Sequence, residues 1–348
     1  MIQELMDKNN CTELHIQYDK ESRCTFIIAL NTTYGDNGNG GTRMRNYSNV
    51  EEGIKDATKL VKAMTKKCVV IGKKYNGGYS GGKGIIVGNP ATQKTPEMLR
   101  RFGIFVQTLK GRFQTGTDMN INLKDIEYMA ERSEFIDGLE AGLGDTAIPT
   151  AFGVLLAMKE LCKWKYGSDS LKNKVIAVQG VGSVGRDLVK RLVEEEAEVV
   201  ATDVNTESLQ SVKEEFGIKI VKPEEIYSVK CDIFSPNACG GILTEENIAK
   251  LNCDLVIGAA NNPLADGLPS VMQMKKKGII YAPDYVVNIG GVFLSMCEVQ
   301  EKDFDYVIEK LKEIIPTRLT QIVKEAEASE ETLFEAAEKI VSEEATRT

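Results

Sequence analysis

Two lysines and an aspartate in the first third of the chain stand beside glycine-rich segments. Lys67 follows Met-Thr-Lys, Lys83 lies within Gly-Gly-Lys-Gly, and Asp118 follows Thr-Gly-Thr. In such a pair of lysines, one ammonium can hold a substrate carboxylate, while its charge and burial favour loss of the proton from the other, which then acts as a base. These residues predict amine chemistry. The alternative for each lysine taken singly is a solvated position in a loop.

The chain has a single histidine, His15, which lies in the alternating segment 13–18. A period of two predicts a strand, with His15 on its more polar face in a structural position. One histidine largely excludes Ser-His-Asp triads, most zinc sites and histidine proton relays. Acid–base chemistry must then rest on lysine, aspartate, glutamate, tyrosine or cysteine.

A phosphate-binding turn is predicted at residues 180–185, which read Gly-Val-Gly-Ser-Val-Gly. The run follows the apolar strand 175–178 and opens a helix, and Asp203 stands at the end of the next predicted strand. The glycines permit a tight turn, the N–H groups of residues 183–186 face a pyrophosphate, and Asp203 accepts the ribose hydroxyls. The alternative is a packing turn that binds nothing. No arginine follows Asp203, which favours NAD over NADP.

The elements that must position these residues differ between the two halves. The second half alternates apolar strands and helices, which predicts a parallel, doubly wound sheet of the Rossmann type. The first half predicts an α+β arrangement, with glycine-rich loops at 34–41 and 76–84. The predicted strands are 13–18, 24–30, 84–88, 175–178, 198–202, 218–221, 231–234, 255–257 and 279–281, and the predicted helices are 2–8, 50–67, 96–109, 123–132, 150–163, 187–196, 206–216 and several within 305–344.

Composition bounds the partners and the location. The chain of 348 residues is 42% hydrophobic and 27% charged, with a net charge of −8. That charge repels phosphate backbones, so no nucleic acid partner is expected. Without an apolar run long enough to span a membrane or a secretory signal, we expect no membrane partner and a cytoplasmic location. The eight cysteines form no CxxC pair, so they predict reduced thiols and no metal site.

Several further segments match a known family in order. Residues 178–182 (Val-Gln-Gly-Val-Gly), 258–262 (Gly-Ala-Ala-Asn-Asn) and 282–288 (Ala-Pro-Asp-Tyr-Val-Val-Asn) join the lysine motifs. Over about residues 17–291 the chain resembles the Glu/Leu/Phe/Val (amino acid) dehydrogenase family, most closely its leucine dehydrogenases. The resemblance implies an N-terminal α/β substrate and oligomerisation domain (1–138 with about 330–348), a Rossmann NAD-binding domain (139–329), a cleft between them, and a homo-oligomer.

The resemblance also implies a role for each matching residue. Lys83 would be the general base, Asp118 would relay protons, and Lys67, helped by Asn288, would bind the substrate carboxylate. Thr150 and Asn261 would hold the nicotinamide carboxamide and ribose. The full set of expected substrate-binding residues is Lys67, Gly41, Asn288, Asn39, Gly116, Val292 and Ser295, and that of cofactor-binding residues is Thr150, Gly180, Gly182, Ser183, Val184, Gly185, Asp203, Asn205, Ala260 and Asn261.

The chain departs from the leucine dehydrogenases in three places. The segment around residues 71–75 is a few residues longer, Ile289 replaces a small residue, and the four side-chain pocket positions are Asn39, Gly116, Val292 and Ser295, where leucine dehydrogenases are apolar. A buried amide facing an aliphatic substrate would be left unsatisfied, at a cost of about 1–3 kcal/mol.

The implied reaction is reversible oxidative deamination of an L-amino acid with NAD. Overall resemblance favours a branched-chain, leucine- or valine-like substrate. The polar residues Asn39 and Ser295 support an alternative, the same reaction on an amino acid with a polar side chain. Two other hypotheses stay open. The chain could be a non-catalytic sensor of NAD or an amino acid, or a different reductase that uses the same cofactor domain.

Overall fold

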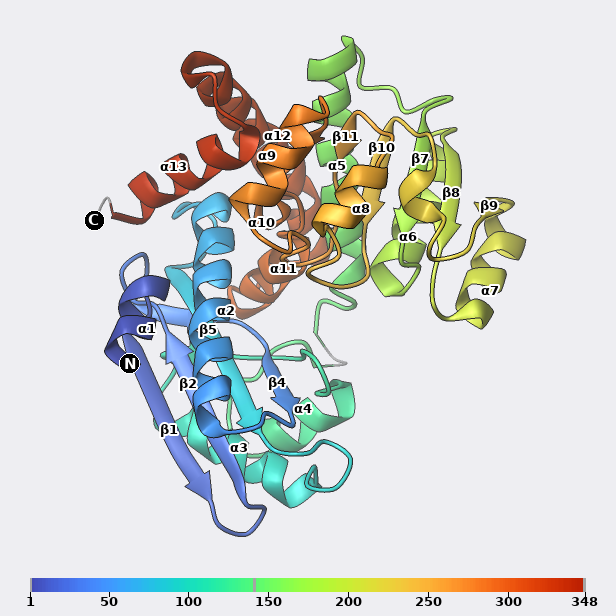
Figure 1. Ribbon diagram of the computed structural model, residues 1–348. Coiled ribbons are helices and arrows are strands. Elements are labelled where there is room, and N and C mark those ends of the chain that lie inside the picture. Colours follow the sequence, from blue (N-terminus) through green and yellow to red (C-terminus); the bar gives the residue numbers. More distant parts are fainter. Residues whose placement is uncertain (1, 140–141, 347–348) are drawn as a thin grey trace. The chain divides into compact units, whose positions relative to one another are not determined.

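The computed structural model describes residues 2–139 and 142–346, and contacts divide the chain into two compact units (Figure 1). The first unit comprises Met1–Asp145, Val292–Phe304 and Glu343–Thr348, and the second comprises Thr146–Gly291 and Asp305–Ser342. The two-domain α/β class is confirmed. The predicted domain boundaries stay a prediction. They differ from the units in grouping 139–145 and 292–304 with the second domain and 330–342 with the first, and residues 140–141 and 347–348 lie outside the described residues.

The first unit is built on a mixed sheet in the order β1-β2-β5-β3-β6, with β4 also pairing with β5. β2 pairs antiparallel with β1 and β5, whereas β3 and β4 run parallel to β5. Its elements are α1 (Ile2–Asn9), β1 (Glu13–Asp19), β2 (Cys24–Leu30), β3 (Asn37–Asn39), β4 (Thr42–Arg45), α2 (Val50–Ile71), β5 (Tyr79–Val87), α3 (Pro96–Thr108), β6 (Phe113–Gln114) and α4 (Leu123–Ala130).

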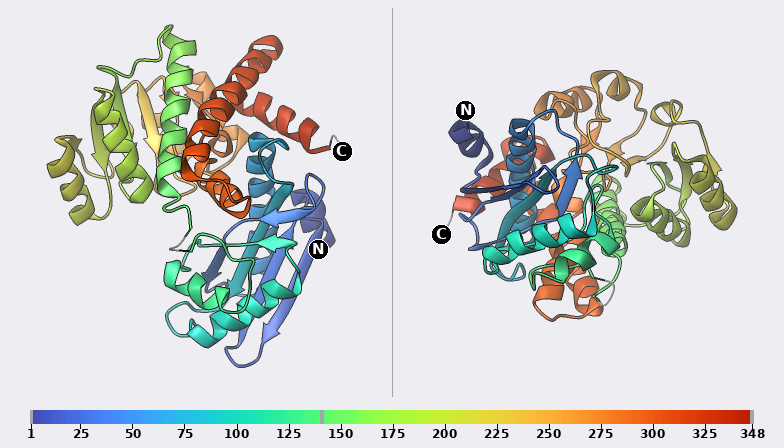
Figure 2. Two further views of the ribbon diagram at one scale, coloured as in Figure 1. Left: turned by 180° about the vertical axis from the view of Figure 1, so that it is seen from behind. Right: turned by 90° about the horizontal axis from the view of Figure 1, so that it is seen from below.

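Strand β2 is buried on both faces because helices cover the sheet on both sides. Phe26 and Ile28 belong to one core cluster with residues of α3 and α4, while Ile27 and Ala29 belong to another with residues of α2. The alternation follows from the period of two in a strand. Figure 1 shows α2 crossing one face of this sheet, and the view from behind in Figure 2 shows α3 and α4 on the other.

Strand β5 begins earlier than the sequence suggests. The prediction placed a glycine-rich loop at 76–84, but the strand starts at Tyr79 and is buried along almost all its length. Its glycines allow close packing rather than flexibility, since a Cβ at Gly81 would lie 2.4 Å from Thr65 Oγ1 of α2 and one at Gly84 would lie 2.2 Å from Thr42 Oγ1. The predicted loop 34–41 likewise contains strand β3.

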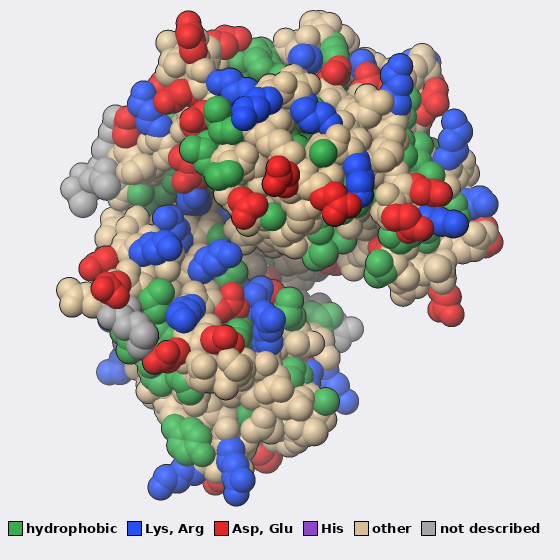
Figure 3. Space-filling view, viewed as in Figure 1, with side chains coloured by type: hydrophobic (Ala, Val, Ile, Leu, Met, Phe, Trp, Pro, Cys, Tyr) green, Lys and Arg blue, Asp and Glu red, His purple; other side chains and the backbone are tan. Residues whose placement is uncertain are grey.

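Helix α2 carries lysines on two different faces. Lys55 and Lys59 are exposed and Lys62 and Lys66 are half-buried, with spacings of three and four that place them on one solvent-facing side. Basic side chains gather over this part of the first unit in Figure 3. Lys67 is instead only 6% exposed. The lysine with the expected role therefore turns towards the protein interior.

The second unit contains a parallel six-stranded sheet in the order β12-β11-β10-β7-β8-β9. Its elements are α5 (Ala147–Tyr166), β7 (Val175–Gln179), α6 (Ser183–Glu194), β8 (Glu198–Thr202), α7 (Thr206–Phe216), β9 (Lys219–Ile220), a 3₁₀ turn (Ile226–Ser228), β10 (Ile233–Pro236), α8 (Glu245–Lys250), β11 (Leu255–Val256), α9 (Leu268–Lys276), β12 (Ile280–Tyr281), α10 (Asp284–Val287), α12 (Phe304–Ser329) and α13 (Leu333–Thr346), and α11 (Gly290–Val299) runs from this unit into the first.

The order of this sheet predicts where a ligand binds. Chain order runs outward in one direction from β7 through β8 to β9 and in the other from β10 through β11 to β12. The direction of winding reverses between β7 and β10, and open α/β sheets bind ligands at the carboxyl ends of strands at such a point. The expected phosphate-binding turn follows β7 directly. Within the described residues, no helix is long and apolar enough to cross a membrane.

Candidate functional site

Lys83 and Asp118 meet in the first unit. Lys83 lies in the middle of β5, opposite Ala29 of β2, and is 5% exposed. Its Nζ lies 2.7 Å from Asp118 Oδ2. Gly41 borders the same carboxylate, because a Cβ there would lie 3.1 Å from the Asp118 Cβ. The structure thus brings together three of the expected residues, which come from three separate segments of the chain.

Arg43 completes this charged cluster and was not predicted. Its Nε donates to Asp118 Oδ2 at 2.8 Å, and its Nη1 donates to Asp56 Oδ2 at 3.2 Å. Asp56 also accepts a hydrogen bond of 2.5 Å from the Tyr47 hydroxyl. Arg43 stands on β4 two residues after Gly41, so its parallel pairing with β5 brings it beside Lys83. The only sequence signal was its place in the same glycine-rich motif.

The cluster keeps Asp118 ionised. Burial acts to raise the pKa of Asp118, but the neighbouring charge of Lys83 and the guanidinium of Arg43 outweigh it and hold the pKa well below its usual range. Asp118 therefore accepts hydrogen bonds from both cations. A carboxylate in contact with a lysine is suited to exchange protons with it.

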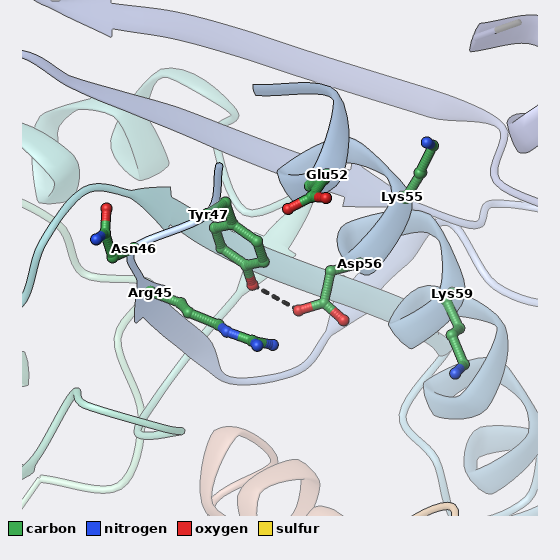
Figure 4. Close-up of a pocket in the computed structure, with 7 residues that line it drawn as sticks. All are labelled: Arg45, Asn46, Tyr47, Glu52, Lys55, Asp56 and Lys59. Carbon is green, nitrogen blue, oxygen red and sulfur yellow. Dashed lines mark hydrogen bonds between the residues drawn. The ribbon is translucent and has the colours of Figure 1, made fainter. Parts of the chain in front are cut away.

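A surface pocket of about 310 Å³ adjoins this cluster without containing Lys83. It is lined by Arg45, Asn46, Tyr47, Glu52, Lys55, Asp56 and Lys59, and Figure 4 shows the Tyr47 hydroxyl directed at the Asp56 carboxylate. Asp56 connects the pocket to Asp118 through Arg43. The pocket therefore lies next to the expected catalytic residues and shares one side chain with their network.

The segment before Lys83, predicted to be longer than in leucine dehydrogenases, is a closed turn. Helix α2 ends at Ile71 and is capped by Gly72, whose φ of 86° is left-handed, and the N–H groups of Tyr75 and Asn76 both donate to the Gly72 carbonyl. The Asn76 side chain then donates to the Tyr79 carbonyl at 2.8 Å. These hydrogen bonds close the turn before β5 begins. Lys83 keeps a position fixed by strand pairing.

Two of the four pocket positions meet through an aspartate that was not predicted. Asn39 Nδ2 donates to Asp137 Oδ2 at 3.3 Å, and a Cβ at Gly116 would lie 2.9 Å from the Asp137 carbonyl oxygen. The other two positions, Val292 and Ser295, are both half-buried on α11. Asp137 is 98 residues from Asn39 in the sequence, so no local motif predicts their contact.

Each of the three glycines at 180, 182 and 185 is required for a different structural reason. Gly180 has a φ of 97°, which favours glycine, and a Cβ at Gly185 would lie 2.0 Å from the Gly180 carbonyl oxygen. Nothing lies within 4 Å of a Cβ built on Gly182, which leaves its backbone open to a ligand. These are a tight turn, close helix packing and room for a pyrophosphate. The residues fit a dinucleotide.

The ends of helices α6 and α7 complete this surface. The N-cap of α6 is Gly182, which has no side chain to cap the free N–H groups beside Ser183 and Val184. Asp203 accepts from the N–H of Val181 at 2.7 Å and of Asn205 at 2.8 Å, so its carboxylate joins the turn to the end of β8. Helix N-termini favour anions, and the contact of the Asp203 carboxylate with ribose hydroxyls stays a prediction.

Asn288 and Asn261 also come together in the second unit. Asn288 Nδ2 donates to Asn261 Oδ1 and to the Ala259 carbonyl, both at 3.0 Å. Ala260, which lies between Ala259 and Asn261 in the chain, is 4% exposed. The Thr150 hydroxyl donates to the Thr146 carbonyl at 2.7 Å within the first turn of α5. The structure thus gives the positions of these four residues, while their roles towards a nicotinamide stay a prediction.

Comparison with known proteins finds one family in both halves of the chain. Residues 11–135 match the Glu/Leu/Phe/Val dehydrogenase dimerisation domain, and residues 203–346 match the Glutamate/Leucine/Phenylalanine/Valine dehydrogenase domain. Phenylalanine dehydrogenase of Lysinibacillus sphaericus is 40% identical over 329 residues, covering 92% of this chain and 85% of the relative. Leucine dehydrogenase of Thermoactinomyces intermedius is 40% identical over 290 residues, covering 82% and 78%.

A solved structure agrees over the whole chain. The L-tryptophan dehydrogenase of Nostoc punctiforme superimposes with a TM-score of 0.85 at 32% identity, covering 99% of this chain and 98% of that one. The three relatives are named for three different amino acids, phenylalanine, leucine and tryptophan. Similarity therefore leaves the substrate side chain open.

Proposed function

We propose that this chain catalyses the reversible, NAD-dependent oxidative deamination of an L-amino acid to the 2-oxo acid and ammonia. The chain belongs to the Glutamate/Leucine/Phenylalanine/Valine dehydrogenase family, whose domain models match most of its length. The observation that carries the proposal is the buried contact of 2.7 Å between Lys83 and Asp118. A non-catalytic sensor has no need of a buried lysine held against an ionised carboxylate.

The chain's own residues would move protons and hold the substrate. Lys67 is buried on a helix whose other lysines turn towards solvent, so its ammonium is suited to hold a substrate carboxylate. Lys83 would accept the proton of the attacking water, and Asp118 would exchange protons with Lys83 as the carbinolamine collapses to the oxo acid and ammonia. Arg43 would keep Asp118 ionised through this cycle.

Residues of the second unit would hold NAD. The free N–H groups after Gly182 would bind its pyrophosphate, Asp203 its ribose, and Thr150 and Asn261 its nicotinamide end. When bound, NAD supplies the acceptor for the hydride that leaves the substrate Cα. Val204 and Asn205 follow Asp203 without an arginine, which supports NAD over NADP.

The substrate side chain is the open part of the function. Relatives named leucine dehydrogenase support a branched-chain substrate. The hydrogen bond between Asn39 and Asp137 supports a polar one instead, because the amide at an expected pocket position contacts a carboxylate. We also keep a cytoplasmic homo-oligomer as part of the proposal, with the dimerisation-domain match as its support.

A screen of the common L-amino acids tests the proposal. The purified chain is incubated with NAD and each amino acid at alkaline pH, and NADH absorbance is followed. We expect turnover with at least one of them, and with NAD in preference to NADP. Binding of NAD or an amino acid with no turnover of any of them would support the sensor and contradict the enzyme.

A further inference from the structure

Asp137 is a buried carboxylate with one oxygen that lacks a hydrogen-bond partner among the described residues. It is 4% exposed, and its backbone N–H donates to the Thr115 carbonyl at 2.9 Å, which places it beside Gly116. Its Oδ2 accepts the bond from Asn39, whereas Oδ1 has no hydrogen-bond partner within residues 2–139 and 142–346. An unpartnered buried carboxylate oxygen is costly. Its place beside two predicted binding positions, Asn39 and Gly116, calls for a ligand that donates a hydrogen bond.

Glycine at position 116 keeps a side chain away from this oxygen. A Cβ at position 116 would lie 3.1 Å from Asp137 Oδ1, so any larger residue would lie against the oxygen that lacks a partner. Asn39 holds the other oxygen through its amide group and presents a further acceptor of its own, its Oδ1. The pocket positions on this side therefore offer acceptors of hydrogen bonds.

A second carboxylate stands close to Asp137. Glu298 of α11 accepts from the Gly138 N–H at 3.3 Å through Oε1, while its Oε2 is buried and lacks a partner among the described residues. Burial and the charge of Glu298 raise the pKa of Asp137 to about 7. All of these residues belong to the first unit.

Helix α11 connects Glu298 with the remaining pocket positions. Val292, Ser295 and Glu298 are spaced by three, so successive side chains are neighbours on the helix surface. All three are half-buried, whereas Phe293, Leu294, Met296 and Cys297 between them are fully buried. The partly open side of α11 therefore carries a hydroxyl and a carboxylate as well as one apolar residue.

From this arrangement we propose that the substrate is an amino acid whose side chain ends in a cationic nitrogen, an ammonium or a guanidinium. Asp137 and Glu298 would accept hydrogen bonds from it, and Asn39 and Ser295 would supply further acceptors. The inference rests on the proposed function, since it assigns the side chain of that reaction's substrate.

Two other substrate classes fit these residues less well. A leucine side chain would leave the free oxygens of Asp137 and Glu298 buried without a partner, and both carboxylates would still be desolvated. A glutamate side chain would bring a third carboxylate to the other two. A cation offsets both costs at once, because it supplies the donors and the opposite charge.

The test compares L-lysine with L-norleucine, which has the same carbon chain without the ammonium. L-ornithine and L-arginine extend the cationic series, and L-leucine and L-phenylalanine extend the apolar one. We expect kcat/KM for the best cationic amino acid to exceed that for L-norleucine by about 100-fold, the size of a desolvated charge pair. An equal or higher kcat/KM for L-norleucine than for every cationic substrate overturns the proposal.

Substitutions place the effect at Asp137. In Asp137→Asn the cationic-to-norleucine ratio of kcat/KM should fall at least about 10-fold, and Glu298→Gln, an independent variant should the first fail to fold, should lower it in the same direction. The matched control is Asp19→Asn, a buried carboxylate of the same unit that pairs with Arg101 far from these residues in the sequence. An unchanged ratio in Asp137→Asn overturns the proposal.

The same assays distinguish a wrong substrate class from a wrong reaction. If apolar amino acids are oxidised and cationic ones are not, the dehydrogenase function stands and the cationic substrate class is wrong. If no amino acid of either series reduces NAD, the proposed function itself is wrong.

Discussion

Asp118 and Asp137 are two aspartates of one unit whose pKa values are shifted in opposite directions, although burial acts to raise both. Asp118 contacts Lys83 and Arg43, and its pKa is held well below the usual range although burial acts against this. Asp137 has an amide as its partner and a glutamate nearby, and its pKa is raised to about 7. The protein thus supplies cations to one carboxylate and withholds them from the other.

The difference indicates two kinds of work. A carboxylate that already has its cations stays ionised and can exchange protons with the lysine it contacts. A carboxylate without a cation carries a cost that a ligand can relieve. Pairs of groups whose surroundings push their pKa values apart often divide the roles in an active site in this way. We assign proton transfer to Asp118 and recognition of the substrate side chain to Asp137.

The largest effect is expected from a substitution that breaks the Asp118 cluster. Asp118→Asn removes the charge that Lys83 contacts and the group that exchanges its proton, so kcat should fall about 1,000-fold. Steady-state kinetics measure this, with thermal unfolding to confirm that the variant is folded. A kcat near that of the wild type would remove Asp118 from the mechanism and leave it a purely structural ion pair.

A neighbouring pair of lysines extends the comparison from anions to cations. Lys67 is buried and Lys66 lies on the solvent side of the same helix. Lys67→Ala should raise KM for the amino acid about 100-fold, because it removes the charge that holds the carboxylate, whereas Lys66→Ala should change KM less than about 3-fold. Equal effects of the two substitutions would argue against a carboxylate site at Lys67.

The pH dependence of stability should separate the two aspartates. The pKa of Asp137 is higher in the folded chain than in the unfolded chain, so the folded state binds the proton more tightly and loses stability as the pH rises between about 4 and about 7. Asp137→Asn lacks this loss. We expect the melting temperature of the variant to rise relative to that of the wild type as the pH increases across this window. Parallel curves of melting temperature against pH would contradict the raised pKa.

The smallest expected effect is the pH dependence of the stability that Asp118 contributes. Its sign is opposite to that of Asp137. The folded pKa of Asp118 lies below the unfolded value, so its contribution to stability is present above about pH 4 and is lost as the pH falls further. The advantage of the wild type over Asp118→Asn should shrink in this acid range. Chemical denaturation at several pH values measures the difference, in which all groups common to both proteins cancel.

Much of the fold follows from patterns that the sequence displays. Alternating apolar residues predict β1 and β2, and continuous apolar runs predict parallel strands of the second unit such as β7. Thr95 and Pro96 mark the start of α3, where the Thr95 side chain accepts from the Met98 N–H. Strand β5 was partly predicted as a loop, because Gly81, Gly82 and Gly84 resemble a flexible segment. Their real function is to let α2, β3 and β4 pack closely against the strand.

The candidate site was predicted unevenly for a physical reason. The turn at 180–185 is a local motif, so its geometry follows from the order of its glycines. Lys83 and Asp118 were singled out by type and by family resemblance. Asp137 and Glu298 escaped notice because their partners are far away in the chain, 98 residues from Asp137 to Asn39 and 160 from Glu298 to Gly138, and only the folded sheet brings them together.

The most direct test of the account measures the products of one reaction. The chain is incubated with NAD and the amino acid that the screen identifies, and NADH, ammonia and 2-oxo acid are quantified beside a folded Lys83→Ala variant. We predict that the wild type forms the three products in equal amounts and that the variant forms almost none. NADH without ammonia, or a Lys83→Ala variant as active as the wild type, would contradict it.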